Sequence, residues 1–360
     1  MELTLMAVAS CHGAGDNPLA SSCWPARFFM WWNSVFPHPA TQLTNGARRR
    51  TDSSYFAFCH GHHLPDEADL VILDFDTEDR IDTQTLDHFE LLVRSILNRR
   101  DSPALLILGH FSPQFQEAFG FHGPEVQHSV VAQYYDIPHI SIKGIAYHDF
   151  LADPDGYRSK YHTDPVLANV RGHELLGDIL ISYFQGQICR GWDAAWGNIF
   201  DVPLLLTEQT GVASDAKGLF GGIRVGGDAG MMNGADDDGR EENKVVRGSD
   251  TSAQVYGAFR VPAGRLSSRP WDLAKFVEAK PFCVAADDLI NPLPPSLFYG
   301  SGWHVYHPES EHGGDGNRHY WYSMLPGSKL RVPVKVGAGD IAVYYLEGGK
   351  SAEASTSIEW

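Results

Sequence analysis

Residues 69–79 read DLVILDFDTED. The first part of this stretch, residues 70–75, is an almost uninterrupted run of apolar side chains. A strand with one face in solvent alternates apolar and polar residues, whereas a continuous apolar run is typical of a parallel strand buried on both faces. The stretch therefore predicts a central strand of a parallel sheet.

The segments on either side of this strand alternate strand-like and helical patterns. Apolar residues recur at helical spacing over 83–99, directly after Asp82, a residue type that caps helix N-termini. Further strands are expected over 3–8, 104–109 and 137–142, and further helices over 24–36, 127–135 and 172–188. This alternation predicts an α/β fold over residues 1–190, with a doubly wound parallel sheet of four or five strands.

Composition separates two further parts of the chain. Residues 191–275 include the Gly-rich and acidic text GLFGGIRVGGDAGMMNGADDDGREEN, whose lack of periodicity predicts a flexible connection. No Gly-Lys-Ser/Thr follows a strand there, which argues against a phosphate-binding loop. In residues 276–360, the alternation in LRVPVKV (330–336) predicts an edge strand between HYWYSML and DIAVYYL. We therefore expect a small antiparallel β domain, sandwich-like in architecture.

Charge and hydropathy limit the kinds of partner that the chain is expected to bind. The chain has 360 residues and a formal net charge of −17, which repels phosphate backbones, so nucleic acid is not an expected partner. No apolar run approaches the roughly 20 residues that cross a bilayer, so no membrane-spanning helix is expected. The first residues lack the features of a signal peptide. The alternative left open is an upstream targeting segment, which would lead to the secretory pathway.

Five cysteines are too few and too scattered for a disulfide framework, and one must stay unpaired within the chain. If the protein is secreted, Cys11 could pair with Cys59, or Cys23 with Cys189, but free buried cysteines are favoured. The cluster CHGHH at 59–63 has metal-ligand chemistry. Zinc sites need a second ligand pair elsewhere, and none is visible, so the sequence predicts a polar loop, with no metal or cofactor.

Four segments, in this order, resemble the sequence blocks of SGNH or GDSL-type hydrolases. They are CHGAGD (11–16), TNGARRRTDSSY (44–55), DLVILDFDTED (69–79) and DPVLANVRGHELLGD (164–178). The resemblance is narrower to fungal, capsule-associated members, with which NPLPPSLFYGSGW (291–303) is also shared. It implies a flavodoxin-like α/β fold and an ester hydrolase. In such enzymes a serine after the first strand attacks the acyl carbon, and a histidine oriented by an aspartate takes its proton.

The nucleophile and oxyanion positions depart from this pattern. Ala7 stands where the resemblance places the serine, so Ser10, three residues later, is the best nucleophile candidate. Gly46 matches the glycine whose N–H would hold the oxyanion, although a plain turn explains it equally well. Glu78 replaces the oxyanion asparagine, and only a protonated Glu78 could donate a hydrogen bond. Asn45, beside Gly46, is expected to contact substrate.

The base also departs from the pattern. Asp164 matches the expected aspartate, but Leu167 replaces the histidine. His173, at the start of the closing helix, could act as base, because a helix N-terminus lowers a histidine pKa and favours the neutral ring. The alternative for His173 is a structural role, in packing the start of the helix. His162 is a third candidate for the base. His110 follows the strand at 104–109 and is expected to contact substrate.

Two functions remain open from the sequence. The first is an ester hydrolase acting on acylated carbohydrate or a similar polymer, with acyl transfer by the same groups as a variant. The second is an inactive relative that binds a glycan or a protein, favoured by the joint loss of serine, asparagine and histidine. Aromatic residues of the β domain could stack on sugar rings or form its core; they are Tyr299, Trp303, Tyr306, Trp321 and Tyr322.

Overall fold

The computed structural model describes residues 4–8 (backbone), 23–48, 51–196, 261–271, 276–286, 298–306, 320–336 and 341–345. The chain divides into two compact units. One unit comprises Met1–Leu180 together with Pro262–Trp360, and the other comprises Ile181–Val261. The first unit holds every candidate site residue.

The first unit is built on a five-stranded sheet in the order β2-β1-β3-β4-β5, with all four neighbouring pairs parallel. Its strands are β1 (Thr4–Val8), β2 (Gln42–Asn45), β3 (Leu70–Leu73), β4 (Ala104–Gly109) and β5 (His139–Ser141). All four residues of β3 are buried, as expected for a strand covered on both faces. The order is that of flavodoxin-like folds, and the predicted doubly wound parallel sheet is confirmed.

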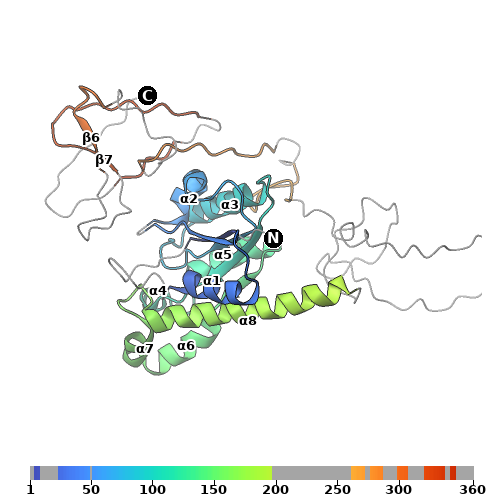
Figure 1. Cartoon of the computed structure of the whole chain (residues 1–360). Coiled ribbons are helices and arrows are strands. Elements are labelled where there is room, and N and C mark those ends of the chain that lie inside the picture. Colours follow the sequence, from blue (N-terminus) through green and yellow to red (C-terminus); the bar gives the residue numbers. More distant parts are fainter. Residues whose placement is uncertain are drawn as a thin grey trace, which may run out of the picture. The chain divides into compact units, whose positions relative to one another are not determined.

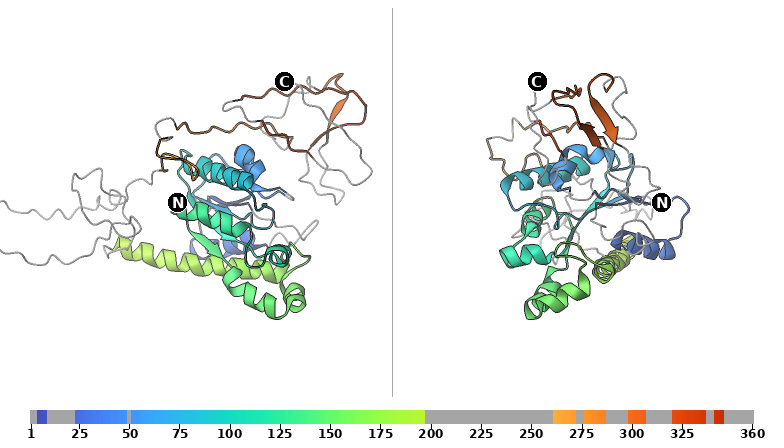
Figure 2. Two further views of the ribbon diagram at one scale, coloured as in Figure 1. Left: turned by 180° about the vertical axis from the view of Figure 1, so that it is seen from behind. Right: turned by 90° about the vertical axis from the view of Figure 1, so that its left-hand side faces the viewer.

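Helices cover both faces of this sheet (Figures 1 and 2). One face carries α1 (Trp24–Val35) and the first part of α8 (Val170–Ala195), which are joined by an ion pair between Arg27 and Asp178. The other face carries α2 (Ser53–Cys59), α3 (Thr83–Leu97) and α5 (Pro124–Tyr134). The remaining helical elements are η2 (His60–His62), α4 (Pro113–Phe119), α6 (Lys143–Ala152) and α7 (Pro154–Tyr161).

Local sequence explains where the central helix starts and which face it buries. Asp82 caps α3 as predicted, since its Oδ1 accepts a hydrogen bond from the Thr85 N–H at 2.7 Å. The apolar stripe of α3 is buried at Phe89, Leu92 and Ile96.

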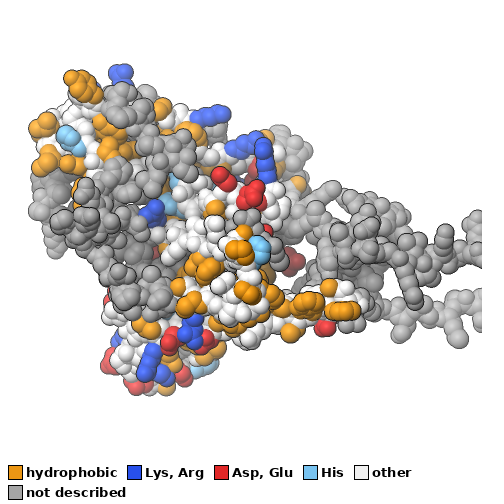
Figure 3. Space-filling view, viewed as in Figure 1, with side chains coloured by type: hydrophobic (Ala, Val, Ile, Leu, Met, Phe, Trp, Pro, Cys, Tyr) orange, Lys and Arg blue, Asp and Glu red, His pale blue; other side chains and the backbone are white. Residues whose placement is uncertain are grey.

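Helix α8 is longer than predicted, and hydrophobic side chains lie along its visible face (Figure 3). Near its end, Trp192 is 58% exposed and Trp196 80% exposed. Among the described residues, no helix is both long and apolar enough to cross a membrane.

The C-terminal region has one small antiparallel sheet in its described part, formed by β6 (Trp303–Tyr306) and β7 (Tyr320–Ser323). Strand β7 lies within the predicted HYWYSML strand. The strand predicted at 330–336 is wrong, because these residues are not paired in a sheet. Alternation of side chains distinguishes the two faces of a strand, but a strand also needs a second backbone to pair with. Pro333 has no N–H group that could donate to such a backbone.

A disulfide joins Cys59, at the end of α2, to Cys283. The expectation of free cysteines is therefore wrong for Cys59. Cys189 is a free thiol, so the alternative pair with Cys23 is wrong as well, and Cys11 lies outside the described residues. The two bonded cysteines are 224 positions apart, and their meeting depends on tertiary contacts that spacing does not reveal.

Residues 262–264 and 276–278 contact Arg94 of α3, which is only 1% exposed. The Arg94 guanidinium donates to both carboxylate oxygens of Glu278, at 3.0 and 2.5 Å. It also donates to the carbonyl oxygens of Pro262 and Gly264 and to the hydroxyl of Tyr135. These backbone and side-chain acceptors satisfy a buried cation.

Candidate active site

Polar side chains gather where β3 and β4 end, because the carboxyl ends of parallel strands share one edge of the sheet. Asp74 directly follows β3, and its side chain is completely buried. Its Oδ2 accepts a hydrogen bond from Trp24 Nε1 at 3.1 Å. The same oxygen lies 3.4 Å from Nδ1 of His110, the residue that follows β4. A carboxylate from one strand end and an imidazole from the next thus meet in the interior.

A second imidazole lies beside this pair. The rings of His110 and His173 are 6.3 Å apart at their centroids, with an edge-to-face arrangement. Among the described residues, neither nitrogen of His110 and not Nδ1 of His173 has a hydrogen-bond partner, although all three are buried. Asp74 Oδ1 is in the same condition. A buried polar atom without a partner costs about 1–3 kcal/mol, so such a cluster is typical of a site prepared for chemistry or ligand binding.

Electrostatics favour the neutral form of His173. Burial lowers its pKa to about 4, with help from His110 and His162, while Asp74 opposes the shift. The direction is the one expected from the sequence, but burial is the main cause, not the helix N-terminus. At neutral pH the His173 ring is therefore unprotonated and able to accept a proton.

The predicted nucleophile, Ser10, lies outside the described residues. Strand β1 ends at Val8, which pairs with Leu73, the residue immediately before Asp74. Ser10 follows Val8 by two positions in the sequence. The backbone of Ala7 lies inside β1, between Asn45 of β2 and Ile72 of β3.

The predicted oxyanion and substrate residues lie at the ends of β2 and β3, the two strands that flank β1 in the sheet. Asn45 ends β2, and its Oδ1 accepts a hydrogen bond from the Ala47 N–H at 3.1 Å, which makes a turn around the buried Gly46. Glu78 is half-buried in the loop after β3, where its N–H donates to the Phe75 carbonyl. The carboxylates of Asp76 and Asp79, on either side of it in the same loop, are buried.

Asp164 is exposed and is used within its own turn. Its Oδ1 accepts hydrogen bonds from the N–H groups of Val166 and Leu167, at 2.8 and 2.7 Å. Among the described residues, the carboxylate that acts on His173 is Asp74. Asp164 instead acts on His162. Burial lowers the pKa of His162 to about 4, and the negative charge of Asp164 opposes this shift. Asp164 thus has a local structural role, because its carboxylate holds the turn together.

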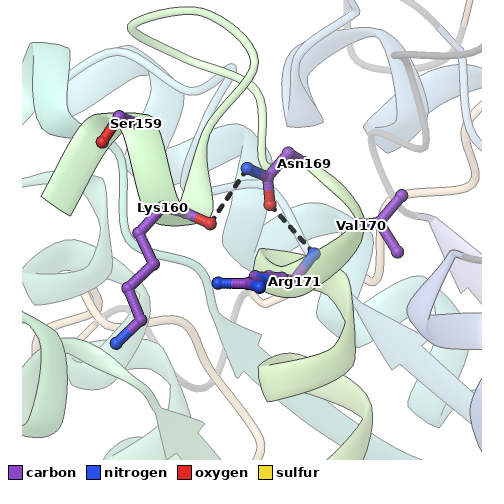
Figure 4. A pocket seen from close by; sticks show the side chains of 5 residues that line it. All are labelled: Ser159, Lys160, Asn169, Val170 and Arg171. Carbon is purple, nitrogen blue, oxygen red and sulfur yellow. Dashed lines mark hydrogen bonds between the residues drawn. The ribbon is translucent and has the colours of Figure 1, made fainter. Parts of the chain in front are cut away.

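A hollow of about 310 Å³ lies beside this turn, at the junction of α7 and α8 (Figure 4). Asn169 caps α8 there, since its Oδ1 accepts from the N–H groups of Arg171 and Gly172, at 2.9 and 3.1 Å. Its Nδ2 donates to the Lys160 carbonyl (Figure 4). The helix N–H groups are therefore already bonded, and the buried histidines do not line this hollow.

The cluster at 59–63 makes structural contacts. Cys59 forms the disulfide, and His62 Nε2 donates to the Cys283 carbonyl at 3.2 Å. His63 Nε2 hydrogen-bonds to the Tyr55 hydroxyl at 2.9 Å. Within the described part of the chain, no three His, Cys, Asp or Glu side chains are grouped to bind a metal ion.

Sequence reasoning missed two buried polar residues, Asp74 and His128 of α5, whose ring nitrogens lie 2.5 Å from Asp76 and 2.8 Å from Asp79. Asp74 could have been noticed by its position directly after a buried strand. His128 has no such signal, because a histidine on an amphipathic helix does not reveal what its ring contacts.

No protein-family model and no curated protein matches the sequence. Several solved structures are similar. A two-domain esterase active on acetylated mannans is 20% identical over 52% of this chain and 49% of its own, with a TM-score of 0.44. The acetyl xylan esterase AlAXEase is 10% identical over 50% of this chain and 99% of its own, with a TM-score of 0.40. A lipase/acylhydrolase from Enterococcus faecalis is 13% identical over 51% and 96%, with a TM-score of 0.38. The aligned region thus spans about half of the two-domain esterase.

Proposed function

We propose that the α/β unit is an ester hydrolase. The observation that carries the proposal is the buried carboxylate of Asp74, 3.4 Å from the His110 ring, with the His173 ring beside it and with Nδ1 of His173 and both nitrogens of His110 lacking a hydrogen-bond partner among the described residues. Unpaired groups of this kind do not stabilise a core, but they can move a proton in a site closed to water. The edge of the sheet at which they lie is where α/β folds bind ligands.

In the proposed reaction Ser10 Oγ attacks the acyl carbon and His173 accepts its proton. The tetrahedral intermediate then collapses, the C–O bond to the leaving alcohol breaks, and His173 returns the proton to that alcohol. Water repeats the sequence on the acyl-serine and releases the carboxylic acid. Asp74 takes the part of the orienting carboxylate, because Asp164 is engaged in its turn. The Gly46 N–H holds the oxyanion, as the sequence resemblance implies.

For the substrate we propose an acylated carbohydrate. The proposal rests on the resemblance to SGNH-type hydrolases, which includes fungal capsule-associated proteins, and it agrees in kind with the esterases on acetylated mannans and xylan to which the chain is similar. Asn45, at the end of β2, and His110 are proposed to contact it. Glu78 is proposed to border the oxyanion, donating a hydrogen bond only when protonated.

A second candidate function is glycan or protein binding without catalysis. It is favoured by one specific observation: the turn at 164–167 has a leucine in the histidine position, and its aspartate is used by backbone N–H groups. The edge of the sheet where β3 and β4 end would then bind an acylated glycan without cleaving it.

Hydrolysis of p-nitrophenyl acetate and release of acetate from acetylated xylan test the proposal. His173→Asn is expected to lower kcat by about 10²–10⁴-fold, the usual contribution of a general base. Ser10→Ala should abolish labelling by a fluorophosphonate. His148→Asn, which changes an exposed histidine, is the control and should leave kcat unchanged. A wild-type protein with neither turnover nor labelling, but with retained glycan binding, would establish the second function in place of the first.

A further inference from the structure

His128 of α5 is buried at the centre of a polar network. This network lies on the opposite face of the sheet from the first part of α8. Its ring stacks on Phe89, with 4.0 Å between centroids. Both ring nitrogens are engaged: Nδ1 lies 2.5 Å from Asp76 Oδ1, and Nε2 lies 2.8 Å from Asp79 Oδ2. The side chains of all three residues are at most 2% exposed. One ring thus joins two carboxylates of the loop that follows β3.

The two carboxylates extend the network to neighbouring elements. Asp76 Oδ2 accepts a hydrogen bond from the backbone N–H of His110 at 3.0 Å. Asp79 Oδ1 accepts one from the backbone N–H of Ser53, the first residue of α2, at 2.6 Å. His128 therefore connects α5, the β3 loop, the residue after β4 and the start of α2.

The contacts at both ring nitrogens fit a doubly protonated His128 between two ionised carboxylates. Two ionised carboxylates can each accept a hydrogen bond from the ring only when both nitrogens carry a proton. Burial alone would lower the pKa of His128, but the bonds to Asp76 and Asp79 outweigh it and raise the pKa to about 10. Other titratable groups that act on this ring or on its carboxylates are Asp52, Asp74, Glu125, His139 and, through His139, Lys143.

We propose that His128 is a positioning residue of the proposed hydrolase site, clamping Asp76 and Asp79 so that the backbone of His110 is held beside Asp74. The inference rests on the proposed function for its catalytic consequence. A neutral side chain at this position would leave the charges of two buried carboxylates uncompensated, and water would enter to solvate them. Release of Asp76 frees the His110 backbone, and the buried imidazoles become hydrated.

The clamp can be tested without any substrate. In protein labelled with ¹⁵N on its histidines, both nitrogens of His128 should show the shifts of a protonated ring from pH 6 to pH 8.5. A neutral tautomer of His128 at pH 7 would overturn the clamp, whatever the protein hydrolyses. This measurement uses the wild-type chain, so it does not depend on a variant that folds.

The positioning role is tested with His128→Gln. The NMR titration midpoint of His173 should move from about 4 toward that of an ordinary histidine, because its surroundings hydrate. With p-nitrophenyl acetate, kcat should fall at least tenfold while KM stays within about twofold. His139→Gln, which removes a neighbouring imidazole outside the clamp, is the matched control and should change neither reading. An unchanged His173 midpoint in a folded His128→Gln protein would refute positioning, whereas absence of wild-type turnover would refute the hydrolase proposal alone.

Discussion

Replacing Arg94 by methionine should loosen the C-terminal segment from α3. The guanidinium donates five hydrogen bonds, two of them to Glu278, and it also lies 4.8 Å from the centre of the Phe276 ring. Methionine has a similar length and can keep the contact with Phe276, but it donates nothing. The variant therefore removes the charge and the donors while it preserves most of the packing.

The magnitude follows from burial. Removing one partner of a buried ion pair destabilises a protein by about 3–5 kcal/mol, because the other partner is left uncompensated. The Glu278 side chain is 32% exposed and can be rehydrated, which places the expected loss at the lower end, about 3 kcal/mol. For a unit of this size, that corresponds to a fall in Tm of about 6–12 °C.

Urea unfolding followed by tryptophan fluorescence and by circular dichroism measures this loss as a change in midpoint at constant m. The matched control is Arg158→Met, because Arg158 pairs with Glu117 and Asp155 at the surface and is 32% exposed. Exposed pairs contribute less than about 1 kcal/mol. If Arg94→Met shifts the midpoint no further than Arg158→Met does, the buried anchor does not stabilise the fold and the reasoning is wrong.

Three further outcomes are expected. Cys59→Ser with Cys283→Ser should lower the free energy of unfolding by about 2–5 kcal/mol, and dithiothreitol should shift the urea midpoint of the wild type but not that of the variant. Gly172→Ala should destabilise the protein and reduce its Tm in calorimetry, since a Cβ there would meet the Tyr161 carbonyl and come within 2.8 Å of Ala168 Cβ; an unchanged Tm would contradict the packing of α8 on the turn. Stability should fall as the pH drops from 6.5 to 4, because burial holds the pKa of several histidines well below the usual 6.5 and the unfolded chain then binds more protons. These are His60, His162 and His173, with a pKa of about 4, and His63, with a pKa of about 3. Urea midpoints that are flat between pH 4.5 and 7 would contradict this.

Much of the α/β unit could be predicted because its signals are local. The apolar run at 70–73 identified a strand covered on both faces, and Asp82 identified the start of α3. The strand predicted at 330–336 failed because pairing depends on a partner that the pattern of one segment does not contain. His110 and His173, which were named from their positions at a strand end and a helix start, lie beside each other, and their roles stay predictions.

Local patterns were enough to predict the doubly wound sheet, since the burial of alternating strands and helices is recorded in spacings of two to four residues. Which polar groups meet depends instead on tertiary contacts. The order of the strands places β3 next to β4, so Asp74 lies 3.4 Å from the ring of His110. It also brings His128 between Asp76 and Asp79. Such contacts join residues far apart in the chain, and they depend on which strand neighbours which, a choice that the separate spacings of strands and helices do not encode.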